Sequence, residues 1–302
     1  MARTETGCAL LLPAPERKVL MENVFTAEKA VKIAAFNNID VYTISTEKFK
    51  TSSINFFFED DLTRERVTLN ALLPAVMRRG SAEHPTFRDI AMELEKLYGA
   101  SFDCGVTKKG ERHILQFYIE FLSQKFVPEA PDIFSAAFEL IYGIITKPFL
   151  ENGHFREDYL AQEKEKLRML IESRVNDKMQ YSVDRCLEEV CRNEPYGIYD
   201  YGFTSDLEKI TAEDLAKHFI RVLQTYPMKV YLTGSISGKQ AERMAVRLRE
   251  MARSPKTVTG SGFKEKRNIR SRYVDETMNV TQGKLCLGLR TTLLRTAANF
   301  RL

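Results

Sequence analysis

The sequence predicts an α+β fold: a mostly antiparallel sheet packed by helices. Strand-like segments come in pairs, at 41–59 and 101–122, while the helical segments are grouped between and after them. Such grouping is typical of α+β domains, because a doubly wound parallel sheet needs a helix after each strand. The chain has 302 residues, 44% of them hydrophobic, which is enough for one large core or two ordinary ones.

The strands are predicted from alternation and from β-branched and aromatic residues. VYTIST alternates, TSSINFFFE is rich in β-branched and aromatic residues, and the turn-like EKFK joins them, so we expect two adjacent strands. The preceding AEKAVKIAAF fits a short helix or a strand, and 1–37 is assigned as an N-terminal extension. SFDCGVTKKGERHILQFYIEFL predicts a hairpin that turns near Lys109-Gly110, and MKVYLTGSI predicts a buried strand.

The helices are predicted from apolar residues at helical spacing. One spans about 63–79, and the next has Thr86 as N-cap, Asp89 at its third position and Gly99 as its stop. EPYGIYDYG predicts a loop, and TAEDLAKHF begins with a capping signature. The remaining helical stretches are PDIFSAAFELIYGIITKPF, HFREDYLAQEKEKLRMLIESRVNDK, YSVDRCLEEVCRN, SDLEKI, TAEDLAKHFIRVLQ and SGKQAERMAVRLREMA.

These elements define one unit over 38–252. Residues 253–272 are polar and rich in Gly, Ser and charge, which predicts a linker. The stretch 273–302 looks like the start of a truncated second half-domain, because YVDETMNVTQGKLCLGLRTT resembles strands. About thirty residues cannot form a core of their own. Either the chain is a truncated form, or these strands pack on the first unit or on a partner.

Composition excludes several classes of protein. The net charge is +4 with interspersed charges, which is not the clustered basic face of nucleic-acid-binding proteins. Five cysteines without a C-x-x-C pair indicate buried thiols in a reducing compartment. No secretory leader and no apolar run of about 18 residues is visible. We therefore expect a cytoplasmic protein without a membrane span.

No complete catalytic motif is present. The four histidines, His84, His113, His154 and His218, include no pair at helical zinc-ligand spacing, so each is expected to be a surface or packing residue. TGSISGK lacks the glycine and hydroxyl positions of a phosphate loop, and no G-x-S-x-G occurs. We expect no metal and no cofactor.

The segment NALLPAVMRRGS is unusual. Its apolar residues have helical spacing, yet Pro74 lies in the middle, and proline costs roughly 3 kcal/mol inside a helix. Ala71, Pro74 and Ala75 share one face of this helix. Residue chemistry alone does not explain why a buried helix carries this combination.

Several stretches, in order over about 41–252, together resemble the insulinase/pitrilysin (inverzincin) family of zinc peptidases, which includes the mitochondrial processing peptidase. They are FKTSSINFFFE, RRGS, LEKLYGASFDC, EKLRMLIE, EPYGIYDYG, ITAEDLAKHF and MKVYLTGSI, and QGKLCLGLRT resembles the opening strand of the family's second half. The resemblance implies a half-domain like that of the mitochondrial processing peptidase. LYGA, the KKGE hairpin and NDK are most similar to the non-catalytic members of bacterial paired peptidases.

Counting back from Arg79-Gly80-Ser81, the family's H-x-x-E-H motif falls on residues 71–75. Both ligand histidines would be alanines, Ala71 and Ala75, and the glutamate base would be Pro74. The distal ligand position would fall on Glu165, with Glu172 seven residues later, and we expect Glu165 to be an ordinary helix-surface acid. One carboxylate without two imidazoles cannot hold catalytic zinc.

The resemblance implies a pseudopeptidase that forms a heterodimer with a catalytically active family subunit and helps to enclose the peptide substrate. The alternative is a stand-alone peptide-binding or scaffold remnant. An enzyme with a different active site and a chain broken by its reading frame are further alternatives. Nucleic acid is not an expected partner.

Overall fold

A computed structural model describes residues 28–129, 131–254, 272–278 and 281–291. Within these ranges one six-stranded sheet has the order β1-β2-β6-β3-β5-β4. Its strands are β1 (Val31–Phe36), β2 (Ile39–Ser45), β3 (Thr51–Asp61), β4 (Ser101–Lys109), β5 (Arg112–Leu122) and β6 (Met228–Gly234). All pairings are antiparallel except β2 with β6. The predicted α+β class, with a mostly antiparallel sheet, is confirmed.

The sheet begins before residue 38. β1 pairs with β2 through a tight turn at Asn37 and Asn38, whose φ angles are +45° and +63°. Asparagine tolerates this left-handed conformation better than most residues, and two such residues in succession suit a two-residue hairpin. The ambiguous stretch AEKAVKIAAF thus contributes a strand, and the last part of the expected N-terminal extension 1–37 belongs to the sheet.

The expectation that 41–46 and 51–59 form adjacent strands is wrong. β6 lies between β2 and β3, parallel to the first and antiparallel to the second. Crossing one intervening strand means spanning about 10 Å, which five linking residues can do. β6 alternates buried and half-buried residues along its whole length. A buried strand such as β6 needs hydrogen-bonding partners on both of its edges. The short link between β2 and β3 gives no sign that another strand lies between them.

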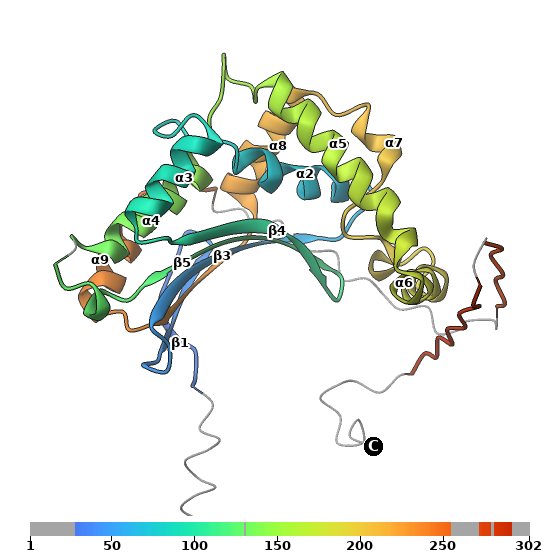
Figure 1. Ribbon diagram of the computed structural model, residues 1–302, viewed down its shortest axis with the longest axis horizontal. Helices are drawn as coiled ribbons and strands as arrows, with labels where there is room; N and C mark the ends of the chain where they lie inside the picture. Colours follow the sequence, from blue (N-terminus) through green and yellow to red (C-terminus); the bar gives the residue numbers. More distant parts are fainter. Residues whose placement is uncertain (1–27, 130, 255–271, 279–280, 292–302) are drawn as a thin grey trace, which may run out of the picture.

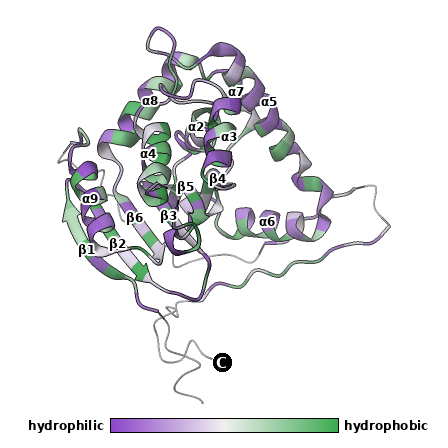
Figure 2. Ribbon diagram, turned by 60° about the vertical axis from the view of Figure 1, so that its left-hand side comes forward, coloured by the Kyte–Doolittle hydropathy of each residue, from purple (hydrophilic) through white to green (hydrophobic). Residues whose placement is uncertain are grey.

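Helices cover one face of the sheet. Figure 1 shows the sheet curved like an arch, with helices on its convex side and no described helix on its concave side. The helices are α2 (Val67–Met77), α3 (Phe87–Lys96), α4 (Ile133–Thr146), α5 (Glu157–Ser173), α6 (Lys178–Val190), α7 (Thr204–Leu207), α8 (Ala212–Thr225) and α9 (Gly238–Arg249). α4 is hydrophobic along most of its length (Figure 2) and has nine buried residues, so the core lies between α4 and the sheet.

Most predicted helix signals are found in the structure. Thr86 and Asp89 form a capping box on α3, as Thr211 and Asp214 do on α8. The predicted hairpin is β4–β5, and Gly110 has φ +58° at its turn. The long charged helix is shorter than expected, because α5 ends at Ser173 and Asp177 caps the new helix α6 by accepting two backbone N–H bonds.

The C-terminal residues that the structure describes contain no strand. Residues 272–278 and 281–291 run beside α6 instead (Figure 1). Most of the predicted linker, 255–271, and the ends of the predicted second unit, 279–280 and 292–302, lie outside the described residues. In the described part of the chain, no helix is long and apolar enough to cross a membrane.

Candidate functional site

The helix that carries the motif positions, α2, is buried almost all round. Ala71 is 7% exposed, Pro74 is buried and Ala75 is half-buried. The helix continues through Pro74, whose carbonyl accepts a hydrogen bond from the N–H of Arg78 at 3.1 Å. Small apolar side chains therefore occupy the face that the family resemblance assigns to zinc ligands.

The edge strand β4 packs against this face. The thiol of Cys104 donates to the carbonyl of Pro74 at 3.1 Å, and burial raises the pKa of Cys104 to about 12. A thiol held neutral is a poor metal ligand, because metals bind the thiolate. In the described residues, no group of three or more His, Cys, Asp or Glu side chains could hold a metal ion.

The acid on α5 that faces α2 is Glu163, two residues before the expected position. Glu163 is 6% exposed and accepts hydrogen bonds from Arg79 at 2.5 Å and Lys166 at 3.0 Å. Glu165, in contrast, lies on the outer face of α5, where its side chain is 63% exposed and pairs with Arg168 at 3.4 Å. The two positions differ because residues two apart on a helix point to opposite sides.

A buried polar network lies next to Ala71, and sequence reasoning missed it. Asp60, at the end of β3, is 2% exposed. It accepts two hydrogen bonds from Arg66 (2.7 and 2.9 Å), one from Tyr226 (2.7 Å) and one from Asn70 (3.1 Å). Burial alone would raise the pKa of Asp60, but the hydrogen bonds from Arg66 and Tyr226 hold it below its ordinary value. The available signal in the sequence was an aspartate at the end of an apolar strand, Asp60, followed six residues later by Arg66 at the start of a helix.

Two of the four histidines belong to this network. The Asn70 amide contacts Nδ1 of His113 at 3.2 Å and Nε2 of His218 at 2.8 Å. Both rings are buried, and burial lowers the pKa of each to about 4. The network connects α2 to β3, β5 and α8. Both of its imidazole rings are neutral at neutral pH. Of the other two, His84 is half-buried in a loop and His154 is exposed.

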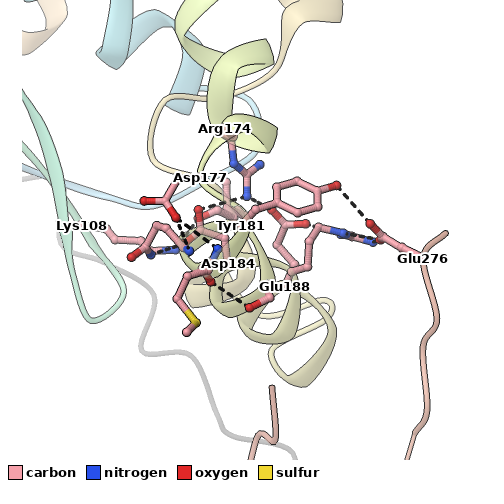
Figure 3. A network of polar contacts seen from close by, with 12 residues as sticks. Lys108, Arg174, Asp177, Tyr181, Asp184, Glu188 and Glu276 are labelled. Atoms are coloured by element: carbon pink, nitrogen blue, oxygen red, sulfur yellow. Dashed lines mark hydrogen bonds and ion pairs between the residues drawn. The ribbon is translucent and has the colours of Figure 1, made fainter. Parts of the chain in front are cut away.

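A separate cavity of about 770 Å³ opens at the corner between α5 and α6. Arg174 lines it, stacks on the ring of Tyr199 at 3.8 Å and pairs with Glu188 at 2.8 Å and Asp184 at 3.4 Å. Figure 3 shows Arg174 pointing toward these two acids. The positive charge of Arg174 is therefore compensated, and none of the motif positions lines the cavity.

Comparisons with known proteins agree with this architecture. No family model matches the chain. Over 263 residues it is 32% identical to a Bacillus subtilis (strain 168) protein named "Probable inactive metalloprotease YmfF", a match that covers 87% of this chain and 61% of that relative. The chain thus spans less than two thirds of the length of this relative.

Two solved structures share the fold. A conserved protein from Enterococcus faecalis V583 matches with a TM-score of 0.70 and 26% identity, over 76% of this chain and 54% of that one. A peptidase M16 inactive domain from Pseudomonas fluorescens matches with a TM-score of 0.62 and 18% identity, over 77% and 53%. Together with the sequence match, these likenesses confirm the predicted resemblance to the insulinase/pitrilysin-type peptidases, and in particular to proteins named as inactive.

Proposed function

We propose that this chain is a pseudopeptidase, a non-catalytic subunit that holds peptide beside a zinc-bearing relative. The proposal rests on the residues that α2 carries at the three motif positions. Ala71, Pro74 and Ala75 supply no imidazole and no carboxylate, and catalytic zinc sites use three protein ligands. Without a metal-bound water and a base, the site has nothing with which to attack a peptide bond.

Two surfaces support a peptide-holding role. β4 is an edge strand of the sheet that the described residues form and lies next to α2, so the side of β4 that faces away from β5 can pair with an extended peptide. The concave face of the sheet carries aromatic side chains: Tyr42 stacks on Tyr231 at 4.8 Å, and Phe57 meets Tyr231 edge-on at 5.7 Å. An aromatic surface on an open sheet suits contact with apolar peptide side chains.

The concave face is also where a partner would complete a chamber. Polar groups surround the aromatic side chains, including Lys229, which pairs with Glu59, and Glu120, which accepts a hydrogen bond from Thr51 at 2.5 Å. A mixed face of this kind resembles the surface of non-obligate interfaces more than a core. It fits a partner that closes over the sheet and leaves room for peptide.

The first experiment is to purify the chain from its own host and identify co-purifying proteins by mass spectrometry. A stoichiometric family member with an intact H-x-x-E-H motif is the expected result. A clean monomer that binds extended peptides without a relative would favour the stand-alone alternative. Metal-dependent peptide hydrolysis by the isolated, unmodified chain would overturn the pseudopeptidase proposal.

A second experiment restores the lost motif with the triple substitution Ala71→His, Pro74→Glu and Ala75→His. We expect no zinc-dependent cleavage from the isolated variant, because the facing acid, Glu163, is already neutralised by Arg79 and Lys166. Circular dichroism establishes that the variant is folded. Zinc-dependent cleavage that a chelator abolishes would show that α2 and α5 still form a competent site.

A further inference from the structure

The C-terminal segment 281–291 packs along α6 and is held there by polar contacts. Arg290 pairs with Glu194 at 2.6 Å and donates to the carbonyl of Val190 at 3.4 Å. Farther back, Glu276 accepts hydrogen bonds from Tyr181 and Arg185, at 3.1 and 2.7 Å (Figure 3). These contacts lie on one side of α6, so they fix which residues of the segment face the helix.

Two thiols meet at the centre of this contact. Cys186, on α6, and Cys286, on the segment, are both half-buried free cysteines, and the side chain of Cys286 lies within hydrogen-bonding reach of the Cys186 thiol. A Cβ on Gly288 would lie 2.9 Å from Sγ of Cys186 and 2.4 Å from Cγ2 of Val190. The absence of a side chain at Gly288 thus allows the backbone of the segment to lie directly against the helix beside Cys186.

We propose that Cys186 and Cys286 form a dithiol site that low-molecular-weight disulfides, such as oxidised glutathione, convert to an intramolecular disulfide. One cysteine thiolate attacks the small disulfide, which forms a mixed disulfide and releases one small thiolate. The second cysteine thiolate then attacks the protein sulfur of the mixed disulfide and releases the other. The two cysteines lose two electrons, the small disulfide gains them, and the protons of the cysteines end on the two released thiols.

The other described cysteines are placed less well for this reaction. Cys191 ends the same helix, α6, but is buried. Cys104 lies against α2, where its thiol donates to the carbonyl of Pro74. Among the described thiols, only Cys186 and Cys286 combine mutual contact with partial exposure to solvent, and both are needed for thiol–disulfide exchange.

A disulfide between Cys186 and Cys286 would hold a row of exposed leucines in one position. Leu285, Leu287 and Leu289 alternate with the residues that face α6, and they are 80%, 80% and 94% exposed. Oxidation would close a loop of about 100 residues between α6 and the segment and would hold this leucine row in place. In the reduced protein, the hydrogen bonds, the ion pairs and the packing at Gly288 hold the segment there without a covalent link.

The test uses the full chain with Cys8→Ser, so that only described cysteines remain. The protein is incubated with oxidised glutathione, alkylated, digested without reduction and mapped by mass spectrometry. We expect one linked peptide pair joining Cys186 to Cys286, a mass decrease of two hydrogen atoms and the loss of two alkylatable thiols. Dithiothreitol should reverse all three changes.

Three variants make the test specific. Cys286→Ser should abolish the intramolecular bond, and Cys191→Ser should leave it unchanged. Gly288→Val keeps both thiols but should displace the segment from α6, which slows bond formation about tenfold or more by loss of proximity. A link from Cys186 to Cys191, a bond between two chains, or unchanged oxidation in Gly288→Val would each overturn the proposal.

Discussion

Mild acid should destabilise this protein through its two buried histidines. Burial lowers the pKa of His113 and of His218 from 6.5 to about 4. In the unfolded chain both rings take up a proton below their ordinary pKa, while in the folded chain they stay neutral. The unfolded state therefore binds more protons between about pH 6.5 and pH 4, and stability must fall as the pH falls through this window.

The size of the effect follows from the two pKa values. For one histidine, lowering the pH from about 7 to about 5 removes about 2 kcal/mol of unfolding free energy, or roughly 4 kcal/mol for both. Asp60 adds nothing in this range, because its pKa is held below an ordinary value that is already lower than pH 5. Asp200 acts in the opposite direction, since burial raises its pKa.

Urea unfolding followed by circular dichroism at the two pH values measures this loss. His218→Gln should lower stability at neutral pH and halve the pH dependence, because one of the two neutral rings is gone. His154→Gln is the matched control, since His154 is exposed and should leave both quantities unchanged. An unfolding free energy that is equal at both pH values would refute the assignment of two buried neutral imidazoles.

Two further predictions concern the same region. Asn70→Ala should lower the unfolding free energy by about 2–5 kcal/mol, because it leaves the buried partners of Asn70 without their hydrogen bonds. Asn55→Ala, on the concave face of the sheet, is the control and should lower the unfolding free energy far less. Urea unfolding measures both losses. Gly202→Ala should cost about 2–4 kcal/mol in the same assay, because φ is +80° and the new Cβ would lie 2.3 Å from Oγ1 of Thr68. Gly99→Ala, at φ +73° with open space around it, isolates the cost of the backbone angle; equal losses in the two glycine variants would contradict the predicted clash.

Local signals in the sequence predicted most elements but not their arrangement. Capping residues such as Thr86 and the turn at Gly110 act within a few residues, so they are visible in the sequence. The insertion of β6 between β2 and β3 depends on a pairing across about 180 residues, and no local pattern encodes it. The same holds for Glu163, because which of two nearby acids faces α2 depends on the rotation of α5 against its neighbour.

By itself the sequence determined the class of fold, the family resemblance and the replacement of the motif by Ala71, Pro74 and Ala75, since each rests on residue identity and spacing. Only the tertiary structure decided what surrounds those positions: the thiol of Cys104, the network around Asp60 and Asn70, and the contact of the C-terminal segment with α6. The physical reason is that burial and hydrogen bonding set the charge and reactivity of a side chain. Both depend on neighbours that are distant in the chain and meet only when it folds.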